Sequence, residues 1–388
     1  MAATMRGLMK LNVTLASNTL LRSSLLNSCR FLYSDQALGI VNYEAARLNF
    51  RNQFINVEDT FRSKMQEVCN TESSMIFTED LKSMLHLVQK KPEDIELIVK
   101  MLTKFNIQNK EMRFGNFIFG PVVMRTFYYL DEPDLALTAF KDPQFDNFFN
   151  QFMSYQILLC LLYKHNRYSD IKEVFEIIKI KNATNNMFPK NSITMVMAAC
   201  YKENTAESIE YALSIWKEFI NDEYYVRRAT SLLAALAINQ NMAHIAIEII
   251  TTIRQARYID VRCLKVAAYT NLKRFTEIVP IFRTSLDQDK PNNQKECYFK
   301  DVIENLEYAM EKENIAKDFE LYKLLALLKN NNRILPDTLQ NHLTTEIKYE
   351  LKRGPRTMNQ ETRTNNNVYL QRQQLTPTRK PMLRNLLY

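Results

Sequence analysis

The chain has 388 residues, 46% of them hydrophobic, with only five glycines and eleven prolines; this composition excludes a β-rich or loop-rich protein and favours helices. Its formal net charge of +8 would indicate nucleic-acid binding if the folded part carried it. However, residues 1–33 contribute +4 and residues 352–388 contribute +7, so the residues between them carry −3. No apolar run approaches the ~20 residues that a membrane-spanning helix needs, so no membrane insertion is predicted.

Residues 1–34 are predicted to be a mitochondrial transit peptide. They are rich in Arg, Ser, Thr, Asn and Leu, and the first acidic residue of the chain is Asp35. This composition, without the continuous apolar core of a secretory signal, is typical of mitochondrial import. Import predicts a location in the mitochondrial matrix. The alternative is an ordinary amphipathic first helix that lacks acidic residues by chance.

Residues 35–118 are predicted to form an N-terminal helical cap or a degenerate repeat. One helix is expected from Leu38 to Cys69. Phe77 precedes a second helix start, and Pro92 opens a third helix, because proline and acidic residues are favoured in the first turn of a helix.

Residues 119–287 are predicted to form about five repeats of one helical hairpin each. Five small or aliphatic residues recur at intervals of 35, 41, 34 and 32 residues, namely Ala136, Ile171, Ala212, Ala246 and Ile278. Each is followed four positions later by a large apolar residue, namely Phe140, Phe175, Trp216, Ile250 and Phe282. A period of this length without strand-like alternation is typical of stacked helical pairs, so the predicted fold is an all-α solenoid whose function lies in its surface.

Residues 288–351 are predicted to form a C-terminal helical cap over the last repeat. Two apolar stripes at helical spacing support it: Phe299, Ile303, Leu306 and Met310, then Leu339, Leu343, Ile347 and Leu351. Residues 352–388 are basic, offer little to bury, and are predicted to be a disordered tail.

No catalytic residue, metal site or cofactor is predicted. The six cysteines contain no Cys-x-x-Cys pair and are interpreted as buried small residues in a reducing compartment rather than a disulfide framework. The four histidines lie far apart without metal-ligand neighbours at helical spacing. No phosphate-binding glycine loop is present, and no aspartate cluster follows the repeats as a metallonuclease would require.

The segment Met153 to Lys179, MSYQILLCLLYKHNRYSDIKEVFEIIK, resembles one unit of the pentatricopeptide repeat family. The resemblance extends well over Leu81 to Ile253, for example in RFGNFIFGPVVMRTFYYLDEPDLALTAFKD and RRATSLLAALAINQNMAHIAIEII. The chain is similar to mitochondrial members of this family in animals. The resemblance implies an RNA-associated matrix protein that acts in the maturation of mitochondrial transcripts, cytochrome b messenger RNA among them, and hence in respiratory-chain function.

The resemblance also implies candidate RNA-binding residues, because in this class each repeat reads one base with a side chain early in its first helix. The early-helix residues are Gln156, Met195, Ser231 and Cys263, with Lys190 as the partner of Gln156. Met195 and Cys263 match no base edge well, so contact by shape or through phosphates is favoured over a readable code. Candidate phosphate contacts are Lys164, Lys202, Arg228, Arg262 and Lys265, although each also suits a solvated helix surface. Aromatic residues such as Trp216 are interpreted as core, with Tyr155 as the exception that could stack on a base.

Two functional hypotheses remain open. In the first, the solenoid binds single-stranded mitochondrial RNA on its first-helix face, and the basic tail adds affinity. In the second, the acidic folded part is a protein-binding scaffold for RNA-processing proteins or the mitochondrial ribosome. A third, a nuclease, lacks the motifs, so the protein is not predicted to be an enzyme.

Overall fold

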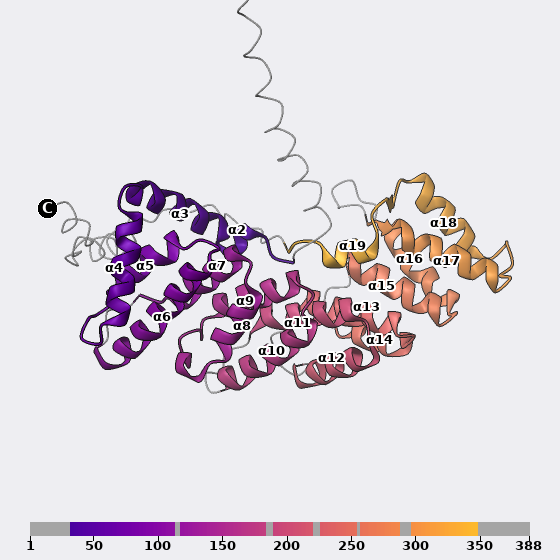
Figure 1. Cartoon of the computed structure of the whole chain (residues 1–388). Helices are drawn as coiled ribbons and strands as arrows, with labels where there is room; N and C mark the ends of the chain where they lie inside the picture. Colours follow the sequence, from indigo (N-terminus) through magenta and orange to yellow (C-terminus); the bar gives the residue numbers. More distant parts are fainter. Residues whose placement is uncertain are drawn as a thin grey trace, which may run out of the picture. The chain divides into compact units, whose positions relative to one another are not determined.

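The structure is a computed structural model that describes residues 32–112, 117–183, 189–219, 226–253, 257–287 and 296–347. These residues form two compact units, Tyr33–Leu158 and Leu159–Glu346. Apart from residues 32–34, the predicted transit peptide lies outside the described residues, as does the predicted basic tail. The described chain is an all-α helical-repeat solenoid (Figure 1).

The first unit is built from helices and one short 3-10 turn. In chain order these are α2 (Asp35–Leu38), α3 (Ile40–Phe54), α4 (Glu58–Asn70), α5 (Thr78–Leu87), α6 (Pro92–Met112), α7 (Gly120–Leu130), α8 (Pro133–Lys141), η2 (Pro143–Phe145) and the first half of α9 (Phe152–Lys164).

The prediction of one helix from Leu38 to Cys69 is wrong, because the chain turns twice within it. Gly39 adopts a left-handed φ of 72° and its amide caps α2, a conformation that costs little without a Cβ atom. An added Cβ would also lie 3.0 Å from the guanidinium of Arg125, which donates to the carbonyl of Leu38. After the second turn, Phe61 of α4 packs edge-on against Phe54, with ring centroids 5.0 Å apart.

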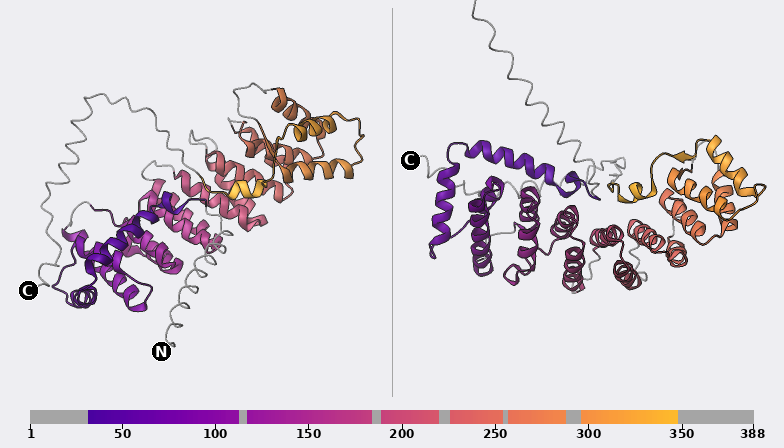
Figure 2. Two further views of the ribbon diagram at one scale, coloured as in Figure 1. Left: turned by 90° about the horizontal axis from the view of Figure 1, so that it is seen from above. Right: turned by 45° about the vertical axis from the view of Figure 1, so that its right-hand side comes forward.

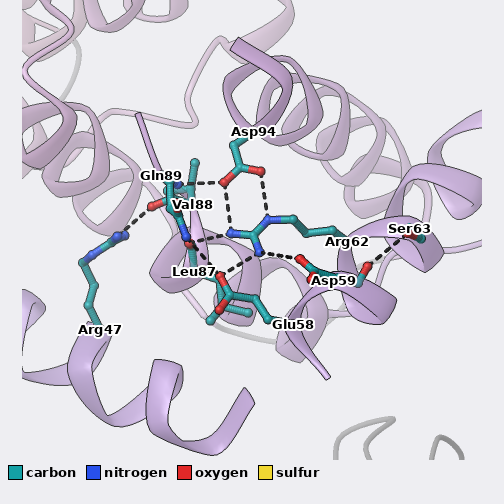
Figure 3. Close-up of polar contacts among 9 residues, drawn as sticks. All are labelled: Arg47, Glu58, Asp59, Arg62, Ser63, Leu87, Val88, Gln89 and Asp94. Atoms are coloured by element: carbon teal, nitrogen blue, oxygen red, sulfur yellow. Dashed lines mark hydrogen bonds and ion pairs between the residues drawn. The ribbon is translucent and has the colours of Figure 1, made fainter. Parts of the chain in front are cut away.

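A buried ionic network joins the helices of this unit (Figure 3). Arg62 of α4 donates two hydrogen bonds to Asp94 of α6, at 2.9 and 3.1 Å, and one to the carbonyl of Leu87 at the end of α5. Its third nitrogen lies 2.7 Å from Glu58. Asp94 also accepts from the amide of Gln89 at 2.8 Å. One guanidinium thereby links three helices through groups that burial would otherwise leave without partners.

His86 makes the stability of this unit depend on pH. Its ring stacks on Phe50 with centroids 4.7 Å apart, and burial is the main cause that lowers its pKa below the ordinary value of 6.5. The unfolded chain therefore binds the proton more readily, so stability is held above pH 6.5 and lost as the pH falls through the lower folded pKa. We expect the unfolding free energy to fall between about pH 7.5 and about pH 5.5, and His86→Gln to reduce that fall. Equal pH dependence in both proteins would contradict the assignment.

The second unit contains the remaining hairpins and a C-terminal group of helices. It consists of the rest of α9, α10 (Tyr168–Ala183), α11 (Lys190–Glu203), α12 (Ala206–Phe219), α13 (Arg227–Asn239), α14 (Ala243–Thr251), α15 (Ile259–Asn271), η3 (Phe275–Glu277), α16 (Ile278–Asp287), β1 (Tyr298–Phe299), α17 (Lys300–Lys312), α18 (Glu320–Asn330), β2 (Ile334–Leu335) and α19 (Leu339–Thr344).

Successive hairpins of this unit stack through their first helices, since α11, α13, α15 and α17 each contact the next. The second helices α12 and α14 lie on one side of this row (Figure 1). Most of the turns within hairpins contain an asparagine with positive φ, namely Asn166, Asn204, Asn241 and Asn314. Asparagine tolerates the left-handed conformation better than most residues, which explains why such short turns can reverse the chain.

The five repeat anchors predicted from the sequence are all fully buried. Their large partners Phe140, Phe175, Ile250 and Phe282 are buried as well. Trp216 is the exception, because it is only half-buried while its neighbour Ile215 fills the core. The interpretation of Trp216 as core is therefore wrong in part. Division of the chain at residues 118, 287 and 351 stays a prediction.

The C-terminal stripe Phe299, Ile303, Leu306 and Met310 is buried as predicted. It packs near a two-residue parallel pairing of β1 with β2, in which Tyr298 pairs with Ile334. The second predicted stripe is shorter than expected, because α19 ends at Thr344 and Ile347 is not helical. The hydroxyls of Thr344 and Thr345 donate back to carbonyls of α19, which competes with continuation of the helix. Leu351 lies outside the described residues.

Within the described ranges, no helix combines the length and the apolar character that crossing a membrane would require.

Candidate nucleic-acid interface

A groove of about 850 Å³ lies on the first-helix face of the second unit. Residues from α11, α13, α15 and α17 line it, together with the beginning of α19. Helices α11, α13 and α15 contribute mostly from their C-terminal halves, for example with Tyr201, Ile238 and Thr270, whereas α17 contributes along its whole length. A surface shared by four successive hairpins suits an extended ligand such as a single strand.

The charges in this groove are mixed, but its cations outnumber its available carboxylates. Lys202 and Lys312 are exposed, and neither makes an ion pair within the part of the chain that the structure describes. Lys273 pairs with Glu313 at 2.5 Å. Asp301 accepts hydrogen bonds from the amides of Val302 and Leu339. Two lysines are therefore able to neutralise phosphates without breaking an existing pair.

The early-helix residues predicted to read bases are all buried. Gln156, Met195, Ser231 and Cys263 pack inside the helix layers. Ser231 donates to Asp260 at 3.0 Å, and the sulfur of Met195 lies 4.0 Å from that of Cys160. Burial also raises the pKa of the Cys263 thiol to about 12. Base reading by these residues stays a prediction, and the described arrangement does not present them to a ligand.

Tyr155, predicted as a possible stacking residue, is also buried. Its ring meets those of Phe140 and Phe152 edge-on, with centroids 6.0 and 6.3 Å away. Burial raises its pKa to about 12. In this arrangement its ring faces are occupied by protein contacts.

The predicted phosphate contacts fall into two groups. Among the lysines, Lys202 lines the groove, and Lys164 and Lys265 are half-buried; Lys190, predicted instead as the base-reading partner of Gln156, is exposed at the start of α11. The two arginines, by contrast, hold the fold together. Arg228 donates to the carbonyls of His342 and Thr345, the latter at 2.9 Å. Arg262 donates to the carbonyls of Arg257 and Cys297 and lies 3.3 Å from Glu296.

Helix α19 covers part of the first-helix face of α13 and α15. This short helix contacts both α13 and α15, on the side away from α12 and α14 (Figures 1 and 2). Leu343 and Thr344 are buried there, and Arg228 at the start of α13 binds the carbonyls at the end of α19. The open part of the first-helix face is therefore the groove at the other end of these helices.

Sequence reasoning missed several residues of the groove, chiefly Asn239, Asn271, Asn305, Tyr308 and Lys312. The signal that could have found the asparagines is their recurrence at intervals of 32 and 34 residues. Within the described ranges, no group of three His, Cys, Asp or Glu residues is arranged to hold a metal ion.

Comparison with known proteins gives relatives of one kind. Over 263 residues the chain is 27% identical to pentatricopeptide repeat-containing protein 2, mitochondrial, of Mus musculus, covering 68% of each chain. The same-named protein of Xenopus laevis is 28% identical over 55% of this chain and 54% of its own length. That of Homo sapiens is 26% identical over 59% and 58%. In the latter two, the match spans less than two thirds of the relative. No family model and no solved structure matches the chain.

Proposed function

We propose that this chain, a relative of the mitochondrial pentatricopeptide repeat-containing protein 2 group, binds single-stranded RNA in the mitochondrial matrix and acts in the maturation of mitochondrial transcripts. The observation that carries the proposal is the groove shared by four successive first helices. The names of the relatives and the acid-free residues 1–34 support the mitochondrial location. Cytochrome b messenger RNA is the transcript to test first, and the proposed role is binding without catalysis.

The physical argument starts from the lysines and amides of the groove. Lys202 lies in the last turn of α11 and Lys312 is the last residue of α17. Helix C-termini carry partial negative charge, which favours lysine there and disfavours a bare phosphate close to the carbonyls. Phosphates are therefore expected at the lysine ammonium groups and bases above the uncharged lining. Because the bases of single-stranded RNA are unstacked, their edges and faces are accessible to protein groups.

Charge reversal of Lys202 and Lys312 tests the proposal. For the double variant Lys202→Glu/Lys312→Glu, we expect affinity for single-stranded RNA to fall roughly tenfold. The slope of log K against log salt concentration should also become less steep by about 1.4, or about 0.7 for each lysine. Fluorescence anisotropy with labelled RNA over a salt series measures both quantities. The matched control is Lys217→Glu/Lys317→Glu, which changes the same charge at exposed lysines outside the groove. Equal losses in both variants would contradict a site in the groove.

A second function, protein binding, is favoured by one specific observation in the first unit. Val41, Leu48 and Ile55 are 50%, 62% and 73% exposed and recur every seventh residue along α3 and just beyond it. An apolar stripe at this spacing suits the face of another helix. A pull-down from nuclease-treated mitochondrial lysate, comparing the full chain with Leu48→Glu, tests it. Proteins that bind the full chain without RNA and are lost from the variant would support the scaffold.

A further inference from the structure

Four asparagines recur in the groove with the period of the hairpins. Asn204, Asn239, Asn271 and Asn305 follow one another at 35, 32 and 34 residues, and all four line the groove. Asn239 and Asn271 are the last residues of α13 and α15, Asn204 follows the end of α11, and Asn305 lies within α17. Each hairpin of this series therefore presents one carboxamide to the same surface.

The carboxamides differ in how far they are already occupied. The amide oxygen of Asn204 accepts from Gln240 at 2.9 Å, and Asn239 hydrogen-bonds with the hydroxyl of Tyr201. Asn271 and Asn305 are exposed, and neither side chain has a hydrogen bond within the described residues. A carboxamide carries a donor beside an acceptor, which matches a base edge with an adjacent acceptor and donor.

Helix α17 adds the remaining contacts that a nucleotide needs. Asn305, Tyr308 and Lys312 are spaced by three and four residues, so they lie on one face of the helix, and all three line the groove. Tyr308 is 67% exposed, so its ring is accessible for a base to stack on. One helix face thus offers an amide for a base edge, a ring for a base face and an ammonium for a phosphate.

We propose that this chain reads RNA bases in this groove, through Asn271 at the end of α15 and Asn305 within α17, with Tyr308 as the stacking platform. This inference rests on the proposed RNA binding and adds where the bases are read. The beginnings of α13 and α15 are packed against α19 and hold buried residues. The recognised ligand is a single strand with two neighbouring bases in the groove, each offering a donor next to an acceptor.

The test uses the full chain and separates base reading from general affinity. A sequence preferred by the wild type is first selected from a randomised single-stranded RNA pool, and a scrambled version of it serves as reference. In Asn271→Ala/Asn305→Ala, we expect the ratio of the two affinities to fall about tenfold while binding of the scrambled RNA is unchanged. Asn70→Ala/Asn330→Ala is the matched control, because both are exposed last residues of helices outside the groove.

Tyr308 supplies an independent readout. Tyr308→Ala is expected to lower the affinity for both the selected and the scrambled RNA about tenfold. Tyr308→Phe keeps the ring and is expected to keep the affinity. An unchanged affinity ratio in the double asparagine variant overturns the inference, even if the lysine variants confirm RNA binding. A wild type that binds RNA without any base preference overturns it in the same way. Absence of RNA binding by the wild type overturns the inference together with the proposed function.

Discussion

Replacement of Asp260 by alanine is expected to lower the free energy of unfolding by about 3 kcal/mol. The carboxylate is fully buried at the start of α15. One of its oxygens accepts from Arg227 at 2.5 Å and from the Ser231 hydroxyl at 3.0 Å. Truncation removes the only carboxylate that the described residues place beside Arg227. The Arg227 side chain is 30% exposed, so water compensates in part and the loss stays at the lower end of the range for a broken buried pair.

Urea unfolding followed by circular dichroism measures this loss, and hydrogen exchange locates it at the starts of α13 and α15. Asp260→Asn is the matched variant, because it keeps the shape and one acceptor while removing the charge. We expect it to lose less stability than Asp260→Ala. A loss below about 1 kcal/mol for Asp260→Ala would mean that the pair contributes no more than an exposed ion pair does.

The second large effect is expected from Asp94→Ala in the first unit, at about 3–5 kcal/mol. Asp94 is buried and binds Arg62 through both carboxylate oxygens, as Figure 3 shows. Its loss also leaves the amide of Gln89 without its acceptor. Arg62 would keep Glu58 and the carbonyl of Leu87, but α4 and α6 would lose the ion pair between them. Hydrogen exchange in α4, α5 and α6 reports the change independently of the second unit.

A double variant separates the stability lost when one charge is left without its partner from the stability that the intact ion pair contributes. In Arg62→Met/Asp94→Leu both charges are replaced by apolar groups of similar size. We expect part of the stability lost in Asp94→Ala to return, because a buried ion pair gains little over well-packed apolar residues, whereas the amide of Gln89 and the carbonyl of Leu87 still lack their side-chain partners. If the double variant were as unstable as the single one, the network would instead contribute strongly in its own right.

Local spacing was enough to predict the hairpins but not every core position. A small residue followed by a large one four positions later lies on one helix face, and Ala136 with Phe140 or Ile171 with Phe175 is buried accordingly. Trp216 obeys the same spacing and remains half-buried, because Ile215 fills the core beside it. Periodicity gives the face of a helix to within about one residue, and packing decides which side chain fits.

The candidate site was predictable only in part. Lys202 was found because a basic residue near a first helix suits a phosphate, and it lines the groove. Arg228 and Arg262 satisfied the same rule, yet both donate to carbonyls from later parts of the chain. The residues near either arginine in the sequence do not predict those partners, since His342 follows Arg228 by 114 residues. An arginine with five donors can bind a phosphate or buried carbonyls equally well.

The sequence by itself determined the helical class, the hairpin period and the buried anchors, because these follow from contacts between residues a few positions apart. Only the tertiary structure decided which part of the first-helix face is open. Six residues of α19 pack against α13 and α15 and leave the groove beside Asn239, Asn271 and Asn305. The physical reason is separation along the chain. A contact between residues this far apart depends on how all the intervening helices stack, and a short sequence pattern does not determine that stacking.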